Sequence, residues 1–173
     1  HTATAVITWM SDTAQPRFVC PISHYAFEPM SSYFAVMHAS EMVHVQFNES
    51  TGMLQVINNL PEAINDATLR TEVYSLDGTV AYENETKLTA APSATTDAGM
   101  LEFPASLSSV HFIRLQLHDA SGKLLSQNFY WHSLPDHPDD FNDLNQLPMV
   151  TLEAKGASKD EEGKRIVTVT LHN

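Results

Sequence analysis

The chain has 173 residues, 43% of them hydrophobic, with a formal net charge of −12 and a single cysteine. This length is enough for one well-buried core with residues to spare. The acidic charge argues against nucleic acid and anionic membranes as partners, because both require clustered Lys and Arg. No stretch approaches the roughly 20 apolar residues of a transmembrane helix, and we expect no signal peptide. Because the chain opens at His1 without a methionine, we expect it to be a piece of a longer protein.

Residues 1–40 are expected to be largely irregular. A short β-like run over residues 5–9 ends at Trp9, and three prolines then prevent a long helix. A short helix is predicted around residues 30–39, where aromatic and apolar side chains cluster. Cys20 lies in an apolar setting, where a small buried hydrophobic residue is a better interpretation than a nucleophile. With no second cysteine, no internal disulfide can form, so packing alone must hold the fold together.

A series of short alternating segments occupies residues 41–133 and predicts the main domain. Gly and Asp turns separate the segments, mostly at intervals of about 8–12 residues, which is typical of an immunoglobulin-like sandwich. We therefore predict an all-β fold, an immunoglobulin-like antiparallel β-sandwich with an irregular N-terminal segment and a C-terminal β-hairpin. The predicted strands are residues 43–47, 53–58, 69–74, 79–82, 100–103, 110–117 and 124–131.

Period-two alternation also predicts which side chains are buried in these strands. In the first strand, one buried set should comprise Val43, Val45 and Phe47, with His44 and Gln46 on the other face. In the last strand, Tyr130 and Trp131 must point to opposite faces. One of these two rings should therefore lie in the core, and the other nearer to solvent or a neighbouring domain.

The end of the chain divides into two further pieces. Residues 134–148 are rich in Pro and Asp and are predicted to form a linker. Residues 149–173 contain two alternating runs joined by a charged turn, which predicts a hairpin and the start of a further β-sandwich. Two strands alone are marginally stable in water, so this hairpin must pack on something else.

No pair of carboxylates suited to sugar chemistry is apparent in the sequence. A retaining glycosidase needs two carboxyl groups about 5 Å apart. Glu49 and Glu85 each follow an asparagine at a predicted strand exit, with no second buried Glu apparent nearby. We therefore predict no catalytic residue in this chain.

The nine histidines do not predict a metal site or a cofactor. His111 and His118 are seven residues apart on one predicted strand, which places them on opposite faces. His132 and His137 bracket Asp136, but they lack the close spacing or the cysteine partner of a zinc site. Surface positions are the default expectation for these side chains.

Several segments together resemble one enzyme family. Residues 4–10 resemble the last barrel strand of glycoside hydrolase family 2 enzymes, in the branch of β-mannosidases and exo-β-glucosaminidases. The further similarities run through nearly the whole chain in the family's order. They are the passage from the final barrel helix (32–36 and 42–46), sandwich turns and a strand (76–78 and 128–131), the exit linker (143–148) and the start of the last sandwich (167–173).

This resemblance implies a five-domain enzyme in which the two catalytic glutamates lie on barrel strands before the portion seen here, so neither maps onto this chain. Residues 1–40 would then be a remnant of the end of the (β/α)8 barrel. Trp9 matches a position expected to line the sugar-binding subsite, although residues 11–16 replace the family's Asn-rich, Trp-Pro loop. The implied partners are the catalytic barrel of the parent enzyme and, through it, a carbohydrate substrate.

The sequence leaves three functions open. The leading hypothesis is a non-catalytic C-terminal region of such a glycosidase, which braces the barrel. A second is a free-standing carbohydrate-binding module, which would need exposed coplanar aromatic rings on one sheet face; Tyr74, Tyr82 and Tyr130 are the main candidates. A third is a structural spacer, for which the Pro-rich first 40 residues have no obvious use. For Trp9, spacing alone favours core packing over a sugar-stacking platform.

Overall fold

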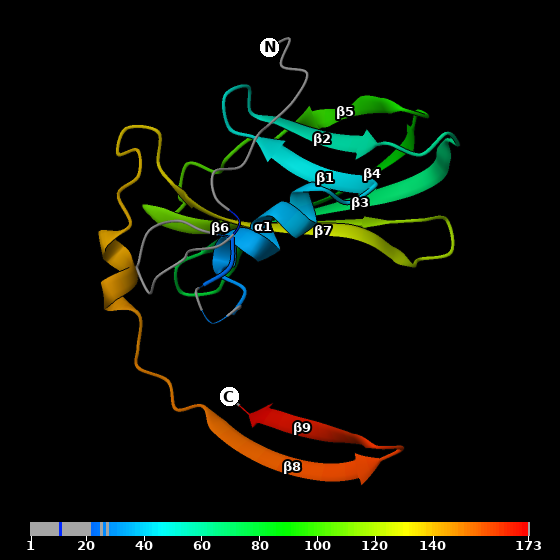
Figure 1. Cartoon of the computed structure of the whole chain (residues 1–173). Helices are drawn as coiled ribbons and strands as arrows, with labels where there is room; N and C mark the ends of the chain where they lie inside the picture. The colour runs from blue at the N-terminus through cyan, green and yellow to red at the C-terminus, as the bar shows by residue number, and fades with distance from the viewer. Residues whose placement is uncertain (1–10, 12–21, 25, 27, 173) are drawn as a thin grey trace.

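The computed structural model describes residues 11, 22–24, 26 and 28–172; Trp9 and Cys20 lie outside this part of the chain. Its centre is a sandwich of two facing antiparallel sheets (Figure 1), so the predicted all-β, immunoglobulin-like fold is confirmed. The seven strands of the sandwich are β1 (Val43–Asn48), β2 (Met53–Asn58), β3 (Ile64–Ser75), β4 (Val80–Ala90), β5 (Ala94–Met100), β6 (Val110–His118) and β7 (Leu124–Ser133).

One sheet has the strand order β1-β2-β5 and the other the order β4-β3-β6-β7. The core lies between them, because alternate apolar side chains of each strand point inward. In β1, Val45 and Phe47 are buried in this core and Val43 packs against it, as the alternation predicts. The largest apolar side chains that are fully buried come from β1, β2, β3 and β6: Val45, Val56, Leu69, Val73, Val110, Ile113, Leu115 and Leu117.

The predicted strand boundaries are wrong in the middle of the sandwich. Strands were expected over residues 79–82 and 100–103, whereas β4 continues to Ala90 and β5 ends at Met100. Both strands are rich in exposed polar residues, since each lies at the edge of its sheet. A half-solvated edge strand has too few apolar residues to display a period-two pattern.

Outside the sandwich, the short helix and the hairpin form as predicted. Helix α1 (Ser31–Ala39) precedes β1, and a 3₁₀ helix, η1 (Asn142–Gln146), lies in the predicted linker. Within the described part of the chain, strands β8 (Glu153–Glu161) and β9 (Lys164–His172) pair only with each other, and all their described side chains are exposed. No helix among the described residues is long and apolar enough to cross a membrane.

Side chains of β7 join the two sheets along the edge strand β1. The backbone N–H of Val45 donates to Ser126 Oγ over 3.2 Å, and Asn128 Nδ2 donates to the Val45 carbonyl over 3.2 Å. Two residues further along β1, the N–H of Phe47 donates to the hydroxyl of Tyr130 over 3.0 Å. An edge strand leaves such backbone groups without a ladder partner, so β7 supplies with side chains what a neighbouring strand would supply with backbone.

On the opposite side of the sandwich, Asn58 ties together the loops after β2 and β4. Its side chain is fully buried, and Nδ2 donates to the carbonyl oxygens of Glu62, Ala90 and Ala91 over 2.9, 3.4 and 3.1 Å. The Asn58 amide oxygen accepts the N–H of Leu60 over 3.0 Å. One buried amide thus satisfies the backbone at the point where the chain changes sheets.

We predict that Tyr130→Phe lowers the free energy of unfolding by about 1–2 kcal/mol, because two donors lose their common acceptor. These donors are the N–H of Phe47 and Nδ2 of Asn128, which lies 2.8 Å from the hydroxyl. Urea denaturation followed by fluorescence measures the change. Tyr82→Phe is the matched control, since the ring of Tyr82 packs on the same core and its hydroxyl makes no hydrogen bond among the described residues. Equal losses in the two variants would contradict this role.

Candidate functional site

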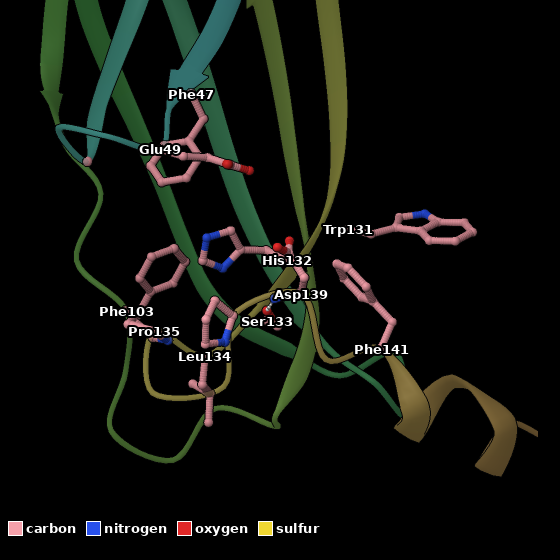
Figure 2. Close-up of a pocket in the computed structure, with 12 residues that line it drawn as sticks. Phe47, Glu49, Phe103, Trp131, His132, Ser133, Leu134, Pro135, Asp139 and Phe141 are labelled. Atoms are coloured by element: carbon pink, nitrogen blue, oxygen red, sulfur yellow. Dashed lines mark hydrogen bonds between the residues drawn. The ribbon is translucent and has the colours of Figure 1, made fainter. Parts of the chain in front are cut away.

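A pocket of about 270 Å³ opens at the end of the sandwich nearest the linker (Figure 2). Aromatic rings and a few polar groups share its walls, and the carboxylates of Glu49 and Asp139 are among the polar groups. Among the residues that the structure describes, no Lys or Arg lines this pocket. Its lining comprises Phe47, Glu49, Gly52, Phe103, Trp131, His132, Ser133, Leu134, Pro135, Pro138, Asp139 and Phe141.

The floor of this pocket is the first part of the linker, folded back against the sandwich. The N–H of Leu134 donates to the Ser109 carbonyl over 3.0 Å, and the N–H of Asp139 donates to Ser133 Oγ over 3.0 Å. The Ser109 hydroxyl also donates to the carboxylate of Asp143 in η1. These contacts hold the linker as an ordered part of the sandwich's end.

Two histidines meet at the wall of the pocket that His132 lines. His111 and His132 lie directly opposite each other on β6 and β7, and Nδ1 of His132 is 2.9 Å from Nε2 of His111. The ring of Phe103 stacks on His132 with a centroid distance of 5.1 Å and an angle of 16°. Burial, followed by the neighbouring His132, lowers the pKa of His111 to about 4, against the opposing effect of the Ser108 carbonyl. Burial also lowers the pKa of His132, although Glu49 opposes this shift.

The expectation that histidines lie at the surface is wrong for His111 and His44. His111 is fully buried and His44 is 8% exposed, although His44 lies on the face of β1 away from Val45. Alternation alone places a strand residue on a face, but the neighbouring elements decide whether that face is covered. No group of three or more His, Cys, Asp or Glu side chains in the described residues could hold a metal ion.

The structure does not bring the two candidate glutamates together. Glu49 stands at the pocket in Figure 2, whereas Glu85 lines a separate hollow with Asp66 and Asp119. A buried glutamate that sequence reasoning missed, Glu72, lies near Glu85 on the neighbouring strand.

Glu72 belongs to a network of charges on the outer face of the larger sheet. Arg70 donates to Glu72 over 2.9 Å and to Glu83 over 2.8 Å, and Arg114 lies 3.5 Å from the other oxygen of Glu72. The two arginines hold Glu72 as a paired carboxylate. Because both carboxylate oxygens of Glu72 are paired with arginines, Glu72 is not suited to general acid or nucleophile chemistry.

Strand β7 reverses the usual pattern of a sandwich strand. From Ser126 onward, its polar residues at every second position face β1 or the other sheet, whereas Phe129 and Trp131 are 53% and 60% exposed. Tyr130 packs on the core, so the prediction that Tyr130 and Trp131 separate to opposite faces is confirmed. Tyr82 also packs on the core. Two of the three tyrosines expected to form an exposed sugar-binding platform, Tyr82 and Tyr130, are therefore core-packed instead.

Comparison with known proteins finds relatives of the sandwich and of nearly the whole chain. Residues 53–135 match the model of the mannosidase Ig/CBM-like domain family. The sandwich of this chain is similar to that domain family, and the resemblance to the β-mannosidase and exo-β-glucosaminidase branch of glycoside hydrolase family 2 is confirmed.

Individual relatives come from the exo-β-glucosaminidase and β-mannosidase groups. The exo-β-D-glucosaminidase of Streptomyces avermitilis is 28% identical over 99% of this chain, which spans 21% of that protein. The mannosylglycoprotein endo-β-mannosidase of Lilium longiflorum is 27% identical over 76% of this chain and 14% of its own length. The crystal structure of the Amycolatopsis orientalis exo-chitosanase matches with a TM-score of 0.79 and 26% identity, covering 95% of this chain and 22% of that one.

We predict that stability falls as the pH drops from about 6.5 to about 4. His111 stays neutral in the folded chain down to a pKa of about 4, whereas in the unfolded chain it takes up a proton near the ordinary histidine pKa of 6.5. The unfolded state therefore binds more protons in this window, and the loss amounts to roughly 3 kcal/mol.

Denaturation midpoints at pH 7, 6, 5 and 4 measure this slope. His111→Gln should flatten it, whatever stability the substitution costs at pH 7. Val110→Ala is the control, because Val110 is fully buried next to His111 but does not titrate. This variant should therefore lose the same stability at every pH. An unchanged slope in His111→Gln would show that other groups carry the acid sensitivity.

Proposed function

We propose that this chain is the sandwich region that braces the catalytic barrel of a glycosidase resembling exo-β-glucosaminidases and β-mannosidases. The supporting observation is coverage: nearly the whole chain matches an exo-β-glucosaminidase, yet it spans only 21% of that protein. The catalytic glutamates belong to the barrel in this proposal. Trp9, outside the described residues, would line the sugar subsite of the parent enzyme.

The same proposal assigns roles to the two ends of the chain. Residues 1–40 would be the end of the barrel, and residues 149–173 the opening of the following sandwich. In α1 no residue is buried, and Tyr33, Phe34 and Met37 are exposed. In the hairpin, Val167, Val169 and Leu171 share one exposed face of β9. Apolar surface of this extent needs a partner, which the remainder of the parent enzyme would supply.

A free carbohydrate-binding module remains the second candidate function, because Phe129 and Trp131 are exposed on one sheet face. The two functions make different demands. A module must bind sugar as an isolated chain, whereas a brace needs only to hold the barrel.

We predict that the purified chain hydrolyses no glycoside. Catalysis of this class needs two carboxyl groups with both roles filled, and Glu49 and Glu85 occupy separate hollows. The assay follows release of p-nitrophenol from aryl β-mannoside and β-glucosaminide, with the complete reading frame as the positive control. Turnover by the chain that disappears in Glu49→Gln or Glu85→Gln would overturn the proposal.

We also predict that α1 and the hairpin exchange their amide hydrogens fast in the isolated chain and slowly in the complete protein. Neither element buries a side chain among the described residues, so each opens at little cost without its partner. Amides of β3 and β6 are the internal reference, since they lie at the centre of the larger sheet in both forms. Strong protection of both ends in a monomeric chain would mean that it needs no barrel.

A further inference from the structure

The outer face of β3, β6 and β7 carries an aromatic cluster that the sandwich itself does not use. Tyr74, Phe112 and Trp131 lie directly opposite one another across the three strands, and Phe129 follows on β7. Together with Arg114, these residues form what we call the aromatic face. The large rings of Phe129 and Trp131 are more than half exposed, on the strand whose polar residues point inward. A strand with this reversed pattern is built to have its outer face covered.

The composition of the aromatic face fits a protein partner. Trp, Tyr and Arg are the residues most enriched at the energetic centres of protein interfaces. Arg114 lies beside a hollow of about 370 Å³ lined also by Tyr74, Gly78, Phe112 and Phe129. Its one ion pair within the described chain is the 3.5 Å contact with Glu72. The guanidinium therefore keeps donors for a carboxylate or carbonyl group that enters this hollow.

The arrangement of the rings argues against a sugar platform. Phe112 and Phe129 stack on each other with a centroid distance of 5.6 Å and an interplanar angle of 20°. Each ring thus already directs one of its faces toward the other, and that face is not free to lie against a pyranose. What the pair offers outward is an apolar ridge, which suits packing against side chains.

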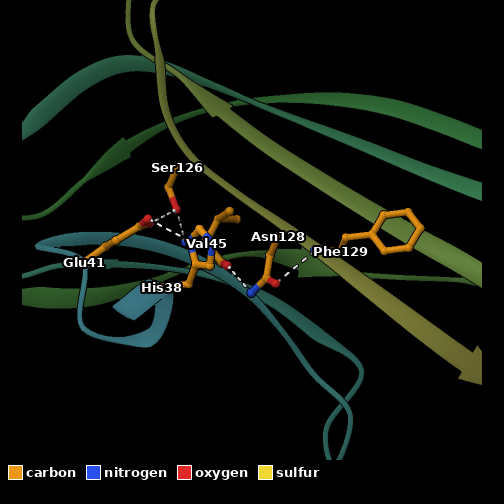
Figure 3. A network of polar contacts seen from close by, with 6 residues as sticks. All are labelled: His38, Glu41, Val45, Ser126, Asn128 and Phe129. Carbon is orange, nitrogen blue, oxygen red and sulfur yellow. Dashed lines mark hydrogen bonds and ion pairs between the residues drawn. The ribbon is translucent and has the colours of Figure 1, made fainter. Parts of the chain in front are cut away.

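Helix α1 indicates which partner covers the face. His38 of α1 lines one hollow together with Arg114 and Phe129 of the aromatic face. His38 pairs with Glu41 over 3.1 Å, and Glu41 accepts the hydroxyl of Ser126 over 3.2 Å, so α1 is tied to β7 (Figure 3). His38 of α1 therefore borders the aromatic face, and a partner that packs on α1 lies beside that face.

We propose that the catalytic barrel of the parent enzyme packs on the aromatic face, with α1 at the edge of the contact. The inference rests on the proposed function, in which the chain before α1 is the end of that barrel. It adds the surface: the outer face of β3, β6 and β7, centred on Trp131 and Phe129, with Arg114 as the polar anchor. The length of the relatives supports it, since about four-fifths of the Streptomyces avermitilis protein lies outside the aligned region.

Hydroxyl-radical footprinting of the isolated chain and of the complete protein tests this contact. Oxidation of Trp131 should be at least fivefold slower in the complete protein. Met100, which is 61% exposed on the other sheet, is the internal control and should oxidise at the same rate in both. Protection of Met100 in place of Trp131 would show that the barrel covers a different face and would overturn the inference.

Substitution provides a second measurement. Trp131→Ala should leave the thermal midpoint of the isolated chain unchanged and lower that of the complete protein, with Leu124→Ala, exposed on the same strand, neutral in both. Equal midpoints for Trp131→Ala and the unaltered complete protein would overturn the inference and leave the bracing function intact. A reading frame without a barrel upstream would end both. Protection of Trp131 in the isolated chain by a β-linked glucosamine oligosaccharide would make the aromatic face a sugar site.

Discussion

Hydrogen bonds from the side chains of β7 to the edge of β1 make one sandwich out of two separate sheets. They satisfy the backbone of Val45 and Phe47, and a buried group left without a partner would cost about 1–3 kcal/mol. The role requires polar residues on the inner side of β7. Because side chains alternate along a strand, the neighbouring positions must then point outward, and these hold Phe129 and Trp131.

The same inward row continues to His132, which meets His111 at the end of the sandwich nearest the linker. Burial lowers the pKa of both histidines, and among the described residues the pocket that His132 lines has two carboxylates, those of Glu49 and Asp139, and no Lys or Arg. Strand β7 therefore connects three features of the molecule: its inward side chains bond to β1, its residue His132 lines the pocket, and its end leads into the linker. The linker's ordered fold at this end follows from its hydrogen bonds to Ser109 and Ser133.

Sequence reasoning predicted the features that repeat along the chain. Apolar alternation placed β1, β2 and β6, and the charged turn placed the hairpin. It failed where the pattern is polar, as in β4 and β5, and where burial depends on a partner strand. The meeting of His111 and His132 could not be anticipated by pairing strands across the turn near Gly122, because the register shifts by one residue between Leu117 and His118; without that shift His111 would lie opposite Trp131. Nor could the sequence show which of Tyr130 and Trp131 faces inward, because the inner side of β7 is the polar one.

The segment between the sandwich and the hairpin bears on where a recombination junction could fall in the gene. Within the described residues, no hydrogen bond joins residues 148–152 to the sandwich, whereas the linker before them is bonded to it up to Asp143. A gene exchange that joins new sequence just after Pro148 would keep the sandwich and its folded linker intact. A junction inside residues 134–146 would remove the floor of the pocket. The module that can be inherited as a unit therefore includes the linker.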